Sequence, residues 1–81
     1  MRTLAVETHA LAENVEFTDH DMVVSLVDGR KVVIPLVWFP RLANAAKSQL
    51  KNYQLLGDGE GIHWPEIDED LSVSGLLRGN H

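Results

Sequence analysis

Cysteine is absent from the 81 residues of this sequence. Without thiols the chain can form neither disulfides nor thiolate metal sites. The absence also suits a protein that works in a reducing compartment, and on this ground we expect a cytoplasmic location.

Long apolar runs are absent as well. The longest, residues 32–39, contains Pro35, and it is far shorter than the roughly 20 apolar residues that a membrane-spanning helix needs. Residues 1–12 alternate polar and apolar side chains, whereas a signal peptide has a continuous apolar segment. We therefore expect no membrane partner and no leader.

Lysine and arginine are absent from residues 52–77, which makes the charge distribution uneven. The whole chain has a net charge of −5. The carboxylates of the segment are Asp58, Glu60, Glu66, Asp68, Glu69 and Asp70. Such a segment repels phosphate backbones and attracts basic proteins or cations. We therefore expect that this chain alone does not bind nucleic acid.

Aromatic residues are scarce: two Trp, two Phe and one Tyr. Trp38 and Trp64 each lie near a proline, in a context where a ring can be half exposed. Two interpretations stay open for both: a core residue, or an anchor that binds a protein partner.

The remaining composition, with 44% hydrophobic and 23% charged residues, is typical of a folded domain. Short β-rich stretches cover residues 14–36. An Asp28-Gly29 pair between two of them predicts a two-residue hairpin turn. Together they predict a three-stranded antiparallel meander, in which Met22, Val24 and Leu26 share one face. Pro35 cannot donate to a strand ladder and should lie at a strand end or an edge.

Helical spacing follows Pro40 and predicts a helical region over about residues 40–52, with a break in its middle. Residues 53–56 can form a short strand, 57–61 a glycine-rich turn and 62–64 an extended segment. Residues 66–70 read as an acidic loop. Ser72 predicts the N-cap of a final helix over 73–78, which Gly79 ends.

The predicted fold class is therefore α+β: a three- to four-stranded antiparallel meander with two or three short helices on one face. We expect one domain over residues 13–79, preceded by a poorly ordered or edge segment over 1–12.

Five motifs resemble a bacterial family called domain of unknown function 2442. They are Asp-Gly-Arg at 28–30, Val-Ile-Pro-Leu-x-Trp-Phe-Pro-Arg-Leu at 33–42, Gly-Asp-Gly-Glu-Gly-Ile-His-Trp-Pro at 57–65, Asp-Glu-Asp at 68–70, and Gly-Leu-Leu at 75–77 followed by Gly79. The resemblance covers about residues 13–79. It implies a small α+β fold with no assigned activity. Some members are fused to a helix-turn-helix domain, and others resemble partners of small proteins in toxin–antitoxin-like gene pairs.

Chemical sites are poorly supported by the residue pattern. His63 could act as a base, but no nucleophile has a matching base. Residues 68–72 copy the start of a calcium loop, yet Val73 and Gly79 stand where glycine and a bidentate glutamate are needed. The glycines of 57–61 lack the Lys-Ser/Thr of a phosphate loop. We therefore predict no enzyme, catalytic residue, metal site or cofactor.

The predicted function is protein interaction, as an acidic regulatory or antitoxin-like partner of a small basic protein. Arg41 should pair with the acidic loop, and self-association into a homo-oligomer is expected because the core is small. The candidate partner-binding residues are Trp38, Arg41, His63, Trp64, Glu66, Asp68, Glu69 and Asp70. The alternative is weak divalent-metal, small-ligand or enzymatic chemistry around His63 and residues 66–70.

Overall fold

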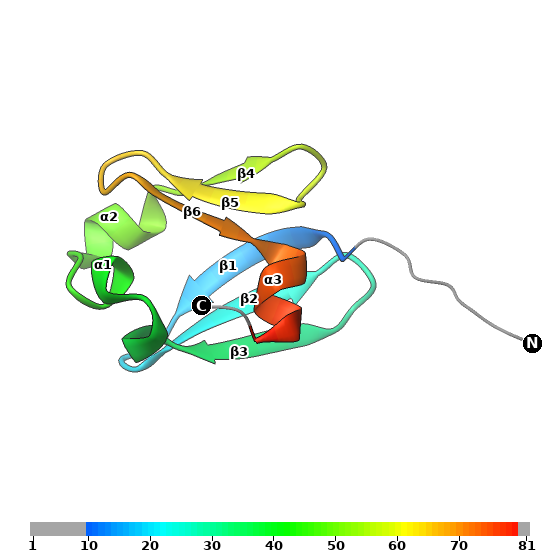
Figure 1. Ribbon diagram of the computed structural model, residues 1–81, viewed down its shortest axis with the longest axis horizontal. Coiled ribbons are helices and arrows are strands. Elements are labelled where there is room, and N and C mark those ends of the chain that lie inside the picture. The colour runs from blue at the N-terminus through cyan, green and yellow to red at the C-terminus, as the bar shows by residue number, and fades with distance from the viewer. Residues whose placement is uncertain (1–9, 80–81) are drawn as a thin grey trace, which may run out of the picture.

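The computed structural model describes residues 10–79, and these fold into two three-stranded antiparallel sheets with short helices (Figure 1). The first sheet, sheet A, contains β1 (Ala12–Phe17), β2 (Asp21–Leu26) and β3 (Lys31–Pro35), in that order. The second, sheet B, contains β4 (Gln54–Leu56), β5 (Gly61–Trp64) and β6 (Glu69–Ser72). The α+β class is confirmed, but a single sheet of three or four strands is wrong, because the chain builds a second complete sheet.

Sheet A follows from strict alternation along its central strand. Met22, Val24 and Leu26 are all 1% exposed or less. The residues between them are only partly buried, as expected for a sheet that covers a core with one face. The predicted meander is therefore confirmed.

The turn between β2 and β3 is longer than predicted. Gly29 N–H donates to the Leu26 carbonyl, and Leu26 N–H donates to the Arg30 carbonyl, which leaves a three-residue loop of Val27, Asp28 and Gly29. Gly29 has φ +98°, whereas the φ of Asp28 is not positive. A two-residue type I′ turn needs positive φ at both positions. The loop is instead a turn followed by a glycine bulge.

Asp28 orders this loop and gives it a pH dependence. Its carboxylate accepts hydrogen bonds from Arg30 N–H at 3.0 Å and from Arg30 Nε at 2.9 Å. The bond from the Arg30 backbone is the main cause that lowers the pKa of Asp28. A carboxylate with a lowered folded pKa stabilises the fold above its unfolded pKa of about 3.9, and this contribution is lost as the pH falls through the folded pKa.

We therefore expect Asp28→Asn to flatten the acid limb of the stability profile. The measurement is the urea midpoint from pH 7 to about pH 2.5, in wild type and variant, around the carboxylate range. Equal losses below pH ~4 in both proteins would contradict this role for Asp28.

Pro35 lies where its missing N–H costs nothing. Leu36 N–H donates to the His20 carbonyl and Leu26 N–H to the Arg30 carbonyl. In an antiparallel ladder, hydrogen-bonded pairs alternate with non-bonded pairs. The register pairs Asp21 with Pro35 at one of the non-bonded positions. The backbone of Pro35 therefore faces away from β2, and the prediction of an edge position is confirmed.

The predicted helical region breaks in its middle, as expected. A 3₁₀ turn, η1 (Leu36–Trp38), precedes α1 (Pro40–Ala43) and α2 (Lys47–Lys51). Pro40 occupies the first turn of α1, a position that needs no N–H. Gln49 Oε1 accepts a hydrogen bond from Ala46 N–H at 2.9 Å and so restarts the helix after the break.

Sheet B includes the end of the segment predicted as an acidic loop over residues 66–70. Residues 69–72 are strand β6, paired with β5 from Gly61↔Ser72 to Trp64↔Glu69, so the loop prediction is wrong for residues 69 and 70. The turn between these strands is only residues 65–68. The strand predicted over 53–56 and the extended segment over 62–64 both belong to this sheet.

Helix α3 (Val73–Arg78) follows β6 directly. Ser72 Oγ accepts from Gly75 N–H at 3.2 Å, and Gly79 ends the helix with φ +80°. Both predicted caps are confirmed. Figure 1 shows α1 and α2 together at one end of the molecule, and α3 near the middle in front of sheet A.

Within the described residues, one hydrophobic cluster joins the two sheets. It contains Met22, Val24 and Ile34 from sheet A with Ile62 and Trp64 from sheet B. No helix of residues 10–79 is long and apolar enough to cross a membrane. Of the predicted N-terminal segment, residues 1–9 lie outside the described residues, whereas Ala12 is buried and begins β1.

Candidate functional site

The β5–β6 hairpin places His63 directly opposite Asp70. Val73 N–H donates to the Glu60 carbonyl, so His63 and Asp70 form a non-hydrogen-bonded pair, the type with the closer side chains. His63 Nδ1 lies 2.5 Å from Asp70 Oδ1. The side chains are 26% and 66% exposed, so the pair lies on the outer surface of sheet B.

The turn at residues 65–68 is held against α1 and the end of α2. Arg41 Nη1 donates to the Asp68 carbonyl at 2.7 Å, and Asn52 Nδ2 donates to Glu66 Oε2 at 2.8 Å. The predicted pairing of Arg41 with this segment is confirmed, but its acceptor is a backbone carbonyl rather than a carboxylate. Asp68 has φ +52°. This left-handed conformation belongs to a turn and does not occur in a regular strand.

Trp64 is a core residue, and the anchor interpretation is wrong for it. Its side chain is 0% exposed. Its Nε1–H donates to the Leu50 carbonyl at 3.0 Å, and its ring packs against that of Phe17 in a T-shaped arrangement with 6.4 Å between centroids. A ring enclosed in this way joins sheet B to sheet A and α2, and it cannot contact a partner.

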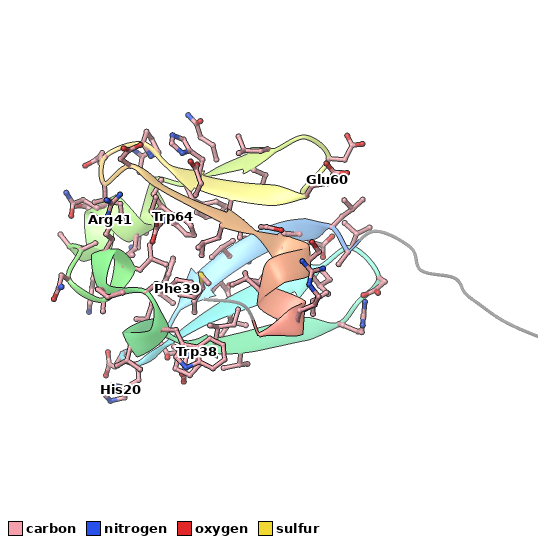
Figure 2. The ribbon with its side chains drawn as sticks, in the orientation of Figure 1. His20, Trp38, Phe39, Arg41, Glu60 and Trp64 are labelled. Atoms are coloured by element: carbon pink, nitrogen blue, oxygen red, sulfur yellow. The ribbon has the colours of Figure 1, made fainter. Side chains whose placement is uncertain are left out.

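Trp38 is partly buried in η1. Figure 2 shows it near His20, on the opposite side of the core from the β5–β6 turn. The predicted site residues therefore do not form one surface. Arg41, His63, Glu66, Asp68, Glu69 and Asp70 gather around the β5–β6 hairpin, whereas Trp38 lies apart and Trp64 lies inside.

The carboxylates of residues 52–77 are divided between two ends of sheet B. Asp58 and Glu60 belong to the β4–β5 turn, and Glu66 and Asp68 to the β5–β6 turn. Figure 2 shows Glu60 at the end opposite Arg41. All four residues are exposed, as is Asp70. The acidic character therefore extends along sheet B instead of concentrating in one loop.

Catalysis and metal binding gain little from this geometry. Within residues 10–79, no group of three or more His, Asp or Glu is placed to hold a metal ion. His63 and Asp70 supply only two atoms. The nearest hydroxyl of β6, Ser72 Oγ, already contacts Ser74 Oγ and caps α3.

Sequence reasoning missed a groove between β1 and the two short helices. It has a volume of about 690 Å³ and is lined by Phe17, Leu42 and Leu50, with Lys47 and Lys51 at α2. The four-residue spacing of the two lysines places them on one face of a helix, but it does not indicate a groove. The groove depends on how α2 packs against sheet A, which the sequence does not show.

Exposed valines in the β2–β3 hairpin and in η1 were missed as well. Val27, Val33 and Val37 are 58%, 60% and 79% exposed. The sequence did not single them out, because it does not show which face or edge of a sheet is left open.

Comparison with known proteins agrees with the resemblance seen in the sequence. No curated protein matches the chain. A solved structure from Rhodospirillum rubrum ATCC 11170, a protein of unknown function, is similar with a TM-score of 0.78 and 29% identity over 90% of each chain. The family model "Protein of unknown function (DUF2442)" matches residues 12–81. The chain therefore belongs to the DUF2442 family.

Proposed function

We propose that this protein is a small protein-interaction domain, whose sheet B binds a basic surface of a protein partner. The observation that supports this is the charge of sheet B and its two turns. From Gln54 to Ser72 the sequence has no Lys or Arg, and its carboxylates at Asp58, Glu60, Glu66 and Asp70 are exposed.

Charge of one sign along an exposed sheet acts mainly on encounter. Complementary potentials raise association rates and exclude partners of the wrong sign, and they contribute less to affinity. Because these carboxylates are exposed to solvent, dissolved salt screens their attraction to a basic partner. Binding should therefore weaken steeply as the salt concentration rises. In the cell, such a domain would act as a regulatory or antitoxin-like partner of a small basic protein.

The test is co-expression of the tagged chain with its flanking genes, followed by identification of what co-purifies. We expect a small basic protein in near-equal amount. The double variant Asp58→Lys/Asp70→Lys should lower its recovery by about tenfold or more, since like charges across an interface are unfavourable.

The matched control is Glu13→Lys/Glu16→Lys, which changes the net charge equally on β1 of sheet A, where both side chains are exposed. This control should retain the partner. Equal losses in both double variants would show an effect of net charge alone, and recovery of no companion would remove the support for a basic partner.

A further inference from the structure

The free edge of β3 is the surface that the proposed function does not use. The bonded pairs of β2 and β3 include His20 with Leu36 and Leu26 with Arg30. By alternation, the backbone groups of Lys31, Val33 and Pro35 point away from β2. In the described part of the chain, no strand lies on that side of β3.

Three of the exposed large hydrophobic side chains lie in the β2–β3 hairpin or directly after it. Val33 lies in the middle of β3 and is 60% exposed. Val27 lies just before the strand in the loop, and Val37 lies just after it in η1. An open strand edge with apolar side chains along its length is a template for adding another strand.

We propose that two copies of this chain pair antiparallel through β3, with a two-fold axis at Val33, and so form one continuous six-stranded sheet. Val33 N–H of each copy would donate to the Val33 carbonyl of the other. Each Lys31 N–H would donate to the opposite Pro35 carbonyl. These four bonds use every N–H that Lys31 and Val33 direct to the edge, and the missing N–H of Pro35 is not needed.

Side chains select this register over its neighbours. A shift by one pairing step sets Lys31 opposite Val33, and a shift by two sets Lys31 opposite Lys31. Like charges directly opposite are unfavourable, whereas two β-branched side chains directly opposite are favourable. The antiparallel arrangement also brings Val27 of one copy to the same end of the interface as Val37 of the other, so the exposed valines cover one another.

The other edge of sheet A limits the assembly to two copies. At β1, Val15 N–H donates to the Tyr53 hydroxyl at 3.1 Å, and that hydroxyl contacts Asn14 Oδ1 at 3.2 Å. Tyr53 therefore occupies the position where a further strand would bond. With one open edge in sheet A, the pairing closes as a two-fold dimer instead of extending into a fibre.

Oxidative cross-linking tests the register directly, because the natural chain has no cysteine. Val33→Cys would face its copy at about 5.5 Å between Cα atoms, within disulfide range. Lys31→Cys would lie four residues from its copy, about 13 Å along the strands, beyond that range. We expect Val33→Cys to form a covalent dimer at least about tenfold faster than Lys31→Cys.

Sedimentation tests the interface without a new covalent bond. The protein concentration should span about 1 µM to 1 mM, because an interface made by one pair of strands is small and the dimer is expected to be weak. The wild type should shift from monomer to dimer. Val33→Lys should raise the dissociation constant by about tenfold or more, because it sets two lysines opposite each other. The control is Leu56→Lys, which adds the same charge at a 44% exposed side chain of β4, and it should change the constant less than about twofold.

A wild type that stays monomeric to 1 mM would overturn the proposal and leave the β3 edge to a strand of another protein. Equal cross-linking of the two cysteine variants, or equal weakening by the two lysine variants, would overturn the assignment to β3 with its axis at Val33.

Discussion

Replacing Trp64 by alanine is expected to lower the free energy of unfolding by about 3–5 kcal/mol, the cost of emptying a large aromatic site in a packed core. The side chain is fully buried. It contacts Phe17 of β1 and Tyr53, which precedes β4. Because small domains have only about 5–15 kcal/mol of stability in total, this variant should be largely unfolded at modest urea concentrations.

Trp64→Phe separates the ring from its hydrogen bond. It keeps most of the apolar volume but leaves the Leu50 carbonyl without the Nε1–H donor that lies 3.0 Å away. An unsatisfied buried acceptor costs about 1–3 kcal/mol, so the phenylalanine variant should lie between wild type and alanine. The measurement is urea unfolding followed by far-ultraviolet circular dichroism. A loss below about 1 kcal/mol for the alanine variant would contradict the central position of this ring.

Sheet A could be predicted from the sequence because its information is local. The alternation of Met22, Val24 and Leu26 defines one buried face, and Pro35 marks the edge. The same holds for α3, because Ser72 and Gly79, which directly precede and follow the helix, cap its two ends. Such signals depend on neighbouring residues and need no knowledge of the rest of the chain.

Sheet B could be predicted only in fragments, because its strands span three or four residues. In such short segments, alternation cannot be distinguished from a loop. Strand β6 is the clearest case. Its sequence Glu-Asp-Leu-Ser reads as polar, and it becomes a strand only because β5 supplies a partner at the correct register.

The candidate site shared this limitation. Net charge along residues 52–77 was visible from the sequence, but its division between the two turns of sheet B was not. The contact between His63 and Asp70 depends on which pairs of β5 and β6 are non-bonded, and that parity is set by long-range pairing. For Trp64, which precedes Pro65, the core and anchor interpretations both stayed open, since the packing that encloses the ring comes from β1 and α2.

Replacing Gly59 by alanine is the second change expected to have a large effect, about 3 kcal/mol or more, because strain and a steric clash coincide. Gly59 has φ +109°, and its carbonyl accepts a hydrogen bond from Ala12 N–H at 2.8 Å. A Cβ at this position would overlap the Ala12 carbonyl oxygen and lie 2.9 Å from the Ala12 nitrogen. Neither obstacle is a flexible side chain, so β1 and the β4–β5 turn would have to separate.

Gly29→Ala is the matched control, since Gly29 has a similar φ of +98° but nothing within 4 Å of an added Cβ. It should lose only about 1–2 kcal/mol, the strain of a positive φ in an L-residue. The difference between the two variants in urea unfolding then measures the clash at Ala12 alone. Equal losses would show that the β4–β5 turn can move away from β1 without cost. In that case the contact between Ala12 and Gly59 would contribute little to joining the two sheets, and the shared core around Trp64, with the hydrogen bond from Val15 N–H to the Tyr53 hydroxyl, would hold them together.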